Sequence, residues 1–321
     1  MFKNVLPCFF EWVTMKTQSC DGRVLGLMNA IPKNKEIVNY FLQSDATIFA
    51  IESSGEEFEN DARIIRCMGR FDEVGDIIEL PNGVEVAMVS YRASPFIVGT
   101  GPTCISISCS EDFDAFIEDA DAAYDSGVFE SCLAKAHTAI MDIAEFCRDD
   151  SSNIKPNRFI VDSNGVVKSG ISGMEFMDIV DLNSYQPAKI FSGIADEEFL
   201  QNSLWQRPWL SRYVSSLGFM SSMNLADEKI RISGFGWSIL SNYCDAILDP
   251  KLPIIANIDD MYVVWISKKN KAFKVSKDIA TVLEHQMLAL NGYTVPGITE
   301  ILGVSNEAAQ QAVSKVQDLF L

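Results

Sequence analysis

The sequence predicts a mixed α/β (α+β) protein of two domains, of which the second is a small module of three strands and three helices. Segments with strand-like and helix-like periodicity alternate along the chain, and this alternation favours a mixed fold. With 321 residues, the chain is longer than one small core requires. Apolar residues at 48% and charged residues at 22% are ordinary for a packed protein. We place the boundary after residue 250, between an N-terminal domain (1–250) and a C-terminal module (251–321).

The first elements are predicted from apolar runs. The stretch Met1–Met15 is apolar but is interrupted by Glu11, so it makes a poor signal peptide and we expect a first strand. Arg23–Ile31 and Thr47–Ile51 have the apolar character of buried strands, and Lys35–Gln43 between them has helical spacing. The chain therefore begins with strands around one short helix.

Two Asn-Gly pairs predict tight hairpins, because such turns require the positive φ angles that Asn and Gly tolerate. The first hairpin has Pro81-Asn82-Gly83 between Ile77–Leu80 and Val84–Ser90. The second has Ser163-Asn164-Gly165 between Arg158–Val161 and Val166–Lys168.

The middle of the chain has a more helical character. Ser110 is predicted to cap an acidic helix whose first-turn carboxylates suit the helix dipole. A second helix is predicted over Val128–Cys147, followed by a polar linker, Asp149–Pro156. Asp196–Leu217 is predicted to be helical. Its aromatic segment Leu204–Trp209 indicates either a packed joint between domains or an exposed binding surface.

The charge excludes two classes of partner. The chain has 44 acidic and 26 basic residues, a formal net charge of -18. Because nucleic-acid affinity depends on lysine and arginine displacing counterions, we expect no nucleic-acid partner. Anionic membranes are disfavoured for the same reason, and no apolar run reaches the length of a membrane span. We expect a cytoplasmic protein without a membrane partner.

No motif for catalysis, a metal or a cofactor emerges. The 8 cysteines lack CxxC spacing, and Cys104 and Cys109 would point to opposite faces of a strand. His137 and His285 have no ligand-type neighbours at metal-binding spacing. A nucleophilic pair of Cys104 and His137 stays open as an alternative. We therefore predict no catalytic residue, no metal site and no cofactor.

The C-terminal module is the most readable region. Ile254–Ile258, Met261–Ser267 and Ala272–Val275 are predicted strands, joined at Asp259-Asp260 and at Lys268-Lys269-Asn270. Three helices follow, with N-caps predicted at Ser276, Thr294 and Ser305 and ends at Asn291-Gly292 and Gly303. This order is winged-helix-like. Most winged helices bind DNA through a basic third helix, but this third helix offers only Lys315 beside Glu307 and Asp318.

Two segments, 270–284 (NKAFKVSKDIATVLE) and 292–300 (GYTVPGITE), resemble in sequence the PqqD-like recognition modules of ribosomally made, post-translationally modified peptides. The resemblance covers residues 251–321 only. It implies that the leader of a precursor peptide binds as an antiparallel strand on the edge of the third strand, beside the third helix. Edge strands offer unpaired backbone groups for this kind of binding.

By position, this binding mode assigns candidate peptide-binding residues on two sides of a groove: Lys271, Phe273, Lys274 and Val275 on the strand, and Gln311, Lys315 and Asp318 on the helix. Five lysines and no acidic residue lie between Lys268 and Lys277. They attract an acidic peptide, protect the edge strand against aggregation, or do both.

The function predicted from these observations is a recognition subunit. It binds the leader of a precursor peptide and presents it to a separate modifying enzyme, so the partners are that leader and that enzyme. Two alternatives stay open: a peptide-modifying enzyme with a fused recognition module, and a winged-helix transcriptional regulator. The peptide, its modification and the oligomeric state are not predicted.

Overall fold

The structure, a computed structural model, describes residues 5–14, 24–43, 46–51, 63–97, 101–141, 158–171, 173, 175–178, 180–181, 202, 205–225, 229–266, 269 and 271–320. The chain divides into two compact units. The N-terminal unit comprises Met1–Phe116 and His137–Ser203, and the C-terminal unit comprises Ile117–Ala136 and Leu204–Leu321. The fold is mixed α/β, as predicted. Residues 204–250, which the sequence placed before the domain boundary, belong to the C-terminal unit, and the boundary at residue 250 stays a prediction.

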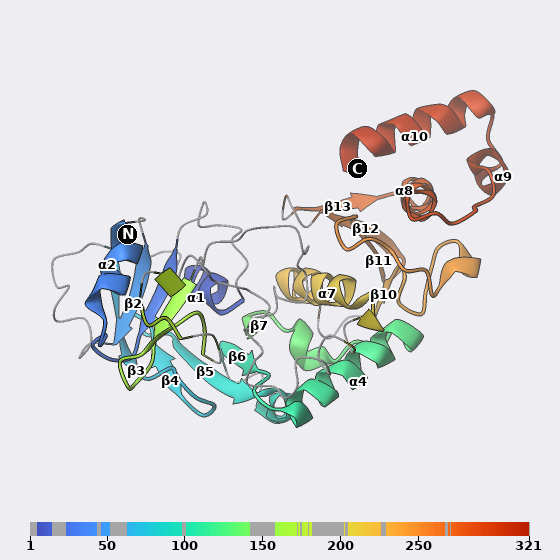
Figure 1. Cartoon of the computed structure of the whole chain (residues 1–321). Helices are drawn as coiled ribbons and strands as arrows, with labels where there is room; N and C mark the ends of the chain where they lie inside the picture. Colours follow the sequence, from blue (N-terminus) through green and yellow to red (C-terminus); the bar gives the residue numbers. More distant parts are fainter. Residues whose placement is uncertain are drawn as a thin grey trace. The chain divides into compact units, whose positions relative to one another are not determined.

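One mixed sheet of nine strands forms the N-terminal unit, in the order β7-β6-β5-β4-β3-β2-β1-β8-β9 (Figure 1). Parallel pairing joins β8 to β1, β1 to β2, β2 to β3, and β5 to β6 and β7. The strands β4 and β9 run antiparallel to their neighbours. All strands except these two therefore end at the same edge of the sheet. Their bounds are β1 Leu25–Met28, β2 Thr47–Ile51, β3 Ile64–Gly69, β4 Ile77–Glu79, β5 Glu85–Ser90, β6 Thr103–Ser106, β7 Thr138–Ile140, β8 Arg158–Val161 and β9 Val167–Lys168.

Helices cover the central strands on both faces, so these strands are apolar on both sides. The helix α1 (Val5–Thr14) packs on one face in a cluster with Phe49, Ile78 and Val86. The helix α2 (Lys35–Gln43) packs on the other. There the Phe41 and Phe159 rings stack with centroids 4.5 Å apart. A side chain at Gly26 would overlap the ring of Phe159, so this strand position requires glycine. The helices α3 (Ser94–Ile97) and α4 (Ser110–Ser126) and the 3₁₀ turn Tyr91–Ala93 complete the element order to residue 126.

The prediction of a first strand is wrong, because residues 5–14 form the helix α1. Its buried residues Val5, Phe9, Trp12 and Val13 recur at helical spacing and share one face. Arg158 of β8 secures the end of this helix by donating hydrogen bonds to the carbonyls of Trp12 and Val13, at 3.0 and 3.3 Å. A cation at a helix C-terminus is favourable for the dipole.

The helix predicted over Val128–Cys147 is also wrong in its described part, residues 128–141. The 3₁₀ turn Ser131–Ala134 and the strand β7 occupy it, and the intervening His137 has a positive φ of 65°. Pairing of β7 with β6 determines the conformation here. The predicted linker Asp149–Pro156 lies outside the described residues, as do residues 196–201, 203 and 204 of the predicted helix Asp196–Leu217. The helix α7 spans Leu210–Met223.

The aromatic segment before α7 was predicted to form a joint between domains or an exposed binding surface, and its described part contains one packed and one exposed tryptophan. Trp209 is buried and stacks on Tyr124, with ring centroids 4.6 Å apart. Arg207 forms a bidentate ion pair with Asp121, at 2.8 and 2.7 Å. Trp205, in contrast, is 88% exposed. All these contacts lie within the C-terminal unit.

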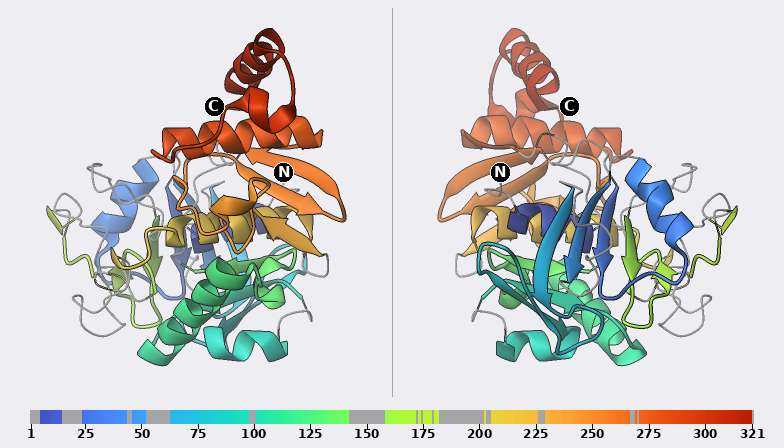
Figure 2. Two further views of the ribbon diagram at one scale, coloured as in Figure 1. Left: turned by 90° about the vertical axis from the view of Figure 1, so that its right-hand side faces the viewer. Right: turned by 90° about the vertical axis from the view of Figure 1, so that its left-hand side faces the viewer.

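The end of the chain forms the predicted winged-helix-like module, with one strand more than predicted. The antiparallel sheet has the order β10-β11-β12-β13, and α8 and α10 lie above it (Figures 1 and 2). The extra strand, β10, precedes the predicted module and pairs with β11. The bounds are β10 Ile230–Ile232, β11 Ile254–Ile258, β12 Met261–Ile266, β13 Lys271–Val275, α8 Lys277–Leu290, α9 Ile298–Leu302 and α10 Asn306–Phe320, with a 3₁₀ turn at Ser241–Tyr243.

The predicted helix caps are confirmed at two of three positions. The hydroxyls of Ser276 and Ser305 accept from the amides of Ile279 and Ala308, both at 3.3 Å. The prediction for Thr294 is wrong, because α9 begins at Ile298 with Gly297 as its N-cap. The carbonyl of Thr294 instead accepts from the hydroxyl of Tyr243, at 2.6 Å.

A buried carboxylate organises the core of the C-terminal unit. Glu284 of α8 is fully buried and accepts four hydrogen bonds. The donors lie between β10 and β11: the hydroxyls of Ser233 and Ser238, at 2.5 and 2.9 Å, and the amides of Ile239 and Leu240, at 3.1 and 2.7 Å. This arrangement meets the requirement that a buried charge be hydrogen-bonded.

A second buried charged side chain holds the residues that precede β11. Arg212 of α7 is fully buried and donates to the carbonyls of Asp249, Leu252 and Pro253, at 3.4, 3.3 and 3.0 Å. Burial lowers the pKa of Arg212 to about 10, and the negative charges of Glu284 and Asp249 oppose this shift.

The turn between β11 and β12 generates a stability prediction. Ile258 pairs with Met261, so Asp259 and Asp260 form a two-residue turn, and both have positive φ, 45° and 67°. Asn-Gly is the preferred pair in such a turn. The double substitution Asp259→Asn, Asp260→Gly should raise the free energy of unfolding by about 1 kcal/mol, because glycine relieves the left-handed strain. Urea unfolding measures it, with Asp278→Gly in the first turn of α8 as the control that should lose stability. A lower midpoint for the double variant would contradict this account of the turn.

The Glu284 site generates a second prediction. Glu284→Ala removes the acceptor of the Ser233 hydroxyl and of the amides of Ile239 and Leu240, whereas the Ser238 hydroxyl can still donate to the Leu240 carbonyl. The substitution should lower the free energy of unfolding by about 3 kcal/mol or more. The matched control is Glu300→Ala, which removes the same charge from an exposed position of α9 and should change stability by less than about 0.5 kcal/mol. Equal effects of the two substitutions in thermal unfolding would show that the buried carboxylate does not organise the unit.

Candidate functional site

The strand β13 is the free edge of the C-terminal sheet. It pairs with β12 on one side, with Val264 opposite Phe273 and Val263 opposite Lys274, and no described strand pairs with its other side. Four of its five residues are exposed and Val275 is half-buried. In an antiparallel ladder, alternate residues direct their N–H and C=O groups away from the partner strand. These outward groups can accept another strand.

The two faces of β13 differ in their surroundings. Lys271, Phe273 and Val275 share one face because side chains alternate along a strand. Val275 packs against the core of the C-terminal unit. The ring of Phe273, which is 39% exposed, contacts the ring of Phe320 at the end of α10, with centroids 5.8 Å apart. The face of Phe273 is therefore the face beside α10, and Ala272 and Lys274 point the other way.

The three predicted residues of the helix side lie together. Gln311, Lys315 and Asp318 are exposed on α10 and line a surface hollow of about 430 Å³ with Ser314 and Leu319. No residue of β13 lines this hollow. Phe273 of the strand side instead contacts α10 at Phe320, which does not line the hollow.

Positive charge gathers along the free edge. Lys269, Lys271, Lys274 and Lys277 are all exposed within nine positions of the chain, although the whole chain has a net charge of -18. In an otherwise acidic protein this edge is a local attraction for anionic groups.

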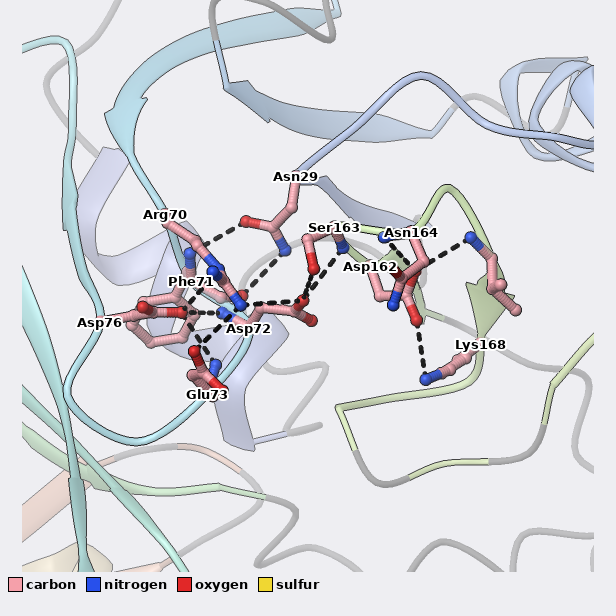
Figure 3. Close-up of polar contacts among 11 residues, drawn as sticks. Asn29, Arg70, Phe71, Asp72, Glu73, Asp76, Asp162, Ser163, Asn164 and Lys168 are labelled. Atoms are coloured by element: carbon pink, nitrogen blue, oxygen red, sulfur yellow. Dashed lines mark hydrogen bonds and ion pairs between the residues drawn. The ribbon is translucent and has the colours of Figure 1, made fainter.

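A second polar arrangement lies in the N-terminal unit, at the edge where the parallel strands end (Figure 3). Asn29 follows β1, Arg70 to Asp76 follow β3, and Asp162 to Asn164 follow β8. The strand order reverses between β1 and β8, since β2 and β3 lie on one side of β1 and β8 lies on the other. In open α/β sheets, ligands bind outside the carboxyl ends of strands at such a switch point.

The side chains of this arrangement bind one another and hold the three loops together. Asn29 and the backbone of Phe71 exchange two hydrogen bonds, at 3.0 and 2.9 Å. The Oδ2 atom of Asp72 accepts from both the amide and the hydroxyl of Ser163, at 3.0 and 2.7 Å (Figure 3). Asp76 accepts from the amides of Asp72 and Glu73 and pairs with Arg70, at 3.4 Å. We refer to these residues as the loop clamp.

The loop clamp was not predicted from the sequence. A signal existed, because Asn29, Arg70 and Asp162 each directly follow a strand. This signal could be interpreted only once the strand order was known, because Asp72 and Ser163 are 91 positions apart in the sequence. The alternative pair of Cys104 and His137 gains no support. Burial raises the pKa of the Cys104 thiol well above its usual value, which opposes the thiolate that a nucleophile requires.

The fold and the free edge together define a mixed α/β protein whose C-terminal unit carries a winged-helix-like module with an exposed edge strand. Comparisons of the chain with protein-family models, curated proteins and solved structures found no match. No helix in the described ranges has the length and apolar character to cross a membrane. Within the same ranges, no group of three or more His, Cys, Asp or Glu residues could hold a metal ion.

The Asp162 turn beside the loop clamp generates a pH prediction. Burial acts to raise the pKa of Asp162, but hydrogen bonds from Lys168, at 2.8 Å, and from the amides of Val166 and Asn164 outweigh it and lower the pKa. A lowered folded-state pKa stabilises the fold above the unfolded pKa, and this contribution is lost as the pH falls through the folded pKa. Asp162→Asn should therefore lose about 2 kcal/mol near pH 6. The difference from the parent should shrink below about pH 4. A difference that does not change with pH would contradict the ionic account.

Proposed function

We propose that the C-terminal unit binds an extended peptide, which adds as a fifth strand to the free edge of β13. The observation that carries this proposal is the exposure of β13 at the end of an antiparallel sheet. In strand addition, main-chain hydrogen bonds supply affinity and the pockets for alternate side chains supply selectivity. The peptide in this proposal is the leader of a ribosomally made precursor, and the protein is a recognition subunit that presents it to a separate modifying enzyme.

The surroundings of β13 support peptide capture over other uses of the edge. Phe273 leaves part of its ring exposed beside Phe320, so an added strand has an apolar surface to cover. Covering it is favourable by about 25 cal/mol for each Å² of apolar area removed from water. The candidate residues of α10 lie on the same side of the sheet as Phe273.

The charge of α10 favours a peptide over duplex DNA and thus the recognition subunit over a transcriptional regulator. The described charged residues of this helix are Glu307, Lys315 and Asp318, two acidic and one basic. A recognition helix needs basic and amide side chains to contact phosphates and base edges. Four other exposed lysines, Lys269, Lys271, Lys274 and Lys277, lie instead on β13 or next to its ends.

For the N-terminal unit, the proposed role is docking onto the modifying enzyme. The alternative, a catalytic unit, would need polar groups available to a substrate. The carboxylates of Asp72 and Asp76 in the loop clamp are instead bonded to backbone amides, Ser163 and Arg70. This internal pairing favours a structural role for the clamp.

We also propose that the protein acts in the cytoplasm. Cys67 and Cys104 are buried free thiols. Burial raises the pKa of Cys67 to about 12, so this thiol stays protonated and unreactive. Buried free thiols are typical of proteins in a reducing compartment.

Substitution by proline tests the strand-addition mechanism. Peptides that bind the parent protein are first selected from a random display library, and their affinities are then measured for Phe273→Pro and Lys274→Pro. Because N–H directions alternate, one of these variants loses a bond to β12 and the other loses an outward N–H. The variant that keeps the melting temperature of the parent should bind at least tenfold more weakly, since strand addition depends on the main chain.

A substitution on α10 serves as the comparison for the two proline variants. Lys315→Glu changes one exposed charge on α10 and leaves the backbone of β13 intact, so it should weaken binding less than tenfold. If the proline variant that keeps the melting temperature of the parent binds every selected peptide as tightly as the parent, edge-strand capture is the wrong mechanism.

A further inference from the structure

The side chains of β13 indicate what kind of peptide would bind along its edge. This inference rests on the proposed function, in which β13 binds an extended peptide. The strand presents three distinct positions in a row. Lys271 is exposed on the face beside α10, Phe273 is the apolar position on that face, and Lys274 is exposed on the opposite face. Ala272, between them, has a side chain too small to select a partner.

The side chains of β13 determine which residue types suit the positions opposite them on an added strand. Residues directly opposite each other on neighbouring strands have Cβ atoms about 5 Å apart, within reach of a lysine–carboxylate pair or an aromatic–apolar pair. The residue opposite Lys274 is then best acidic, the residue opposite Phe273 apolar, and the residue opposite Lys271 acidic. The residue opposite Ala272 is free to vary.

The direction of the added strand fixes the order of these residues. Every pair in the C-terminal sheet, from β10 to β13, is antiparallel. Antiparallel pairing is also slightly more stable per residue than parallel pairing. In an antiparallel strand, the residue opposite Lys274 comes first in the peptide, followed by those opposite Phe273, Ala272 and Lys271.

We propose that the peptide recognised by this protein is acidic and carries the sequence acidic–apolar–any–acidic, read from its N-terminus. The first carboxylate pairs with Lys274, the apolar side chain covers Phe273 and Phe320, and the second carboxylate pairs with Lys271. A peptide bound in the parallel direction would need the opposite order, acidic–any–apolar–acidic. The order within the peptide therefore reports both the register and the direction of capture.

Four fluorescein-labelled octapeptides test the proposal against the full-length protein by fluorescence anisotropy. The first is Ser-Thr-Glu-Leu-Thr-Glu-Thr-Ser. The second, Ser-Thr-Glu-Thr-Leu-Glu-Thr-Ser, has the same composition in the parallel order. The third has Gln in place of both Glu residues, and the fourth has Lys in place of the first Glu. The first peptide should bind about fivefold more tightly than the second and the third, since each cross-strand pair contributes up to about 1 kcal/mol.

Exchanging the charges of residue 274 and of the first acidic residue of the peptide tests whether these two residues pair. Lys274→Glu should weaken the first peptide about fivefold and strengthen the fourth, which carries Lys at the position opposite residue 274. The matched control is Lys229→Glu, which makes the same change of charge at an exposed lysine next to β10. This control should leave the order of the four affinities unchanged.

The outcomes separate this inference from the function on which it rests. Equal affinities of the first two peptides, tighter binding of the second, or no exchange at residue 274 would overturn the proposed sequence. If none of the four binds while library-selected peptides still depend on β13, the sequence is wrong and strand capture stands. If no selected peptide depends on β13, both are wrong.

Discussion

The C-terminal unit depends on a carboxylate buried in its core. Glu284 brings a negative charge into the apolar cluster of α8 and is stable there only because four donors surround it. All four donors belong to the segment that connects β10 to the rest of the sheet. The side chain therefore fixes this segment against α8. Arg212, equally buried, does the same for the residues that lead into β11.

These two buried charges explain why β13 differs from the other strands of its sheet. The segment that leads out of β10 and the segment that leads into β11 are bound to buried side chains. The strand β13 is held instead by β12 and by the helix α8, which Ser276 caps. The edge is thus positioned firmly from one side and left open on the other. Lysines along an edge strand oppose its pairing with the same edge of a second copy. In the proposed function, the same lysines also favour an anionic peptide strand.

Local signals in the sequence predicted much of this architecture. Asn82-Gly83 and Asn164-Gly165 predicted two hairpins, and Ser276, Ser305 and Gly303 predicted helix ends, because each acts on its immediate neighbours. The apolar run of α1 and the segment of β7 were misassigned. Short apolar stretches fit both a helix and a strand, and tertiary packing decides between them.

What the sequence could not provide depends on distance along the chain. Glu284 lies 51 positions from Ser233 and 44 from Leu240, and Asn29 lies 42 positions from Phe71. Neither the buried carboxylate nor the loop clamp has a local pattern that would reveal it. Of the candidate site, the exposed strand and its lysines were predicted. The contact between Phe273 and Phe320, which sets the face of the strand beside α10, required the structure.

The central claim is that a peptide completes the free edge of β13 through its main chain. Hydrogen exchange at single amides, followed by NMR with and without a bound peptide, measures this directly. The account predicts that alternate amides within residues 271–275 gain protection on binding, while the amides of β10, at the other edge, keep their exchange rates. Binding that protects α10 or the N-terminal unit and leaves every amide of β13 unchanged would contradict it.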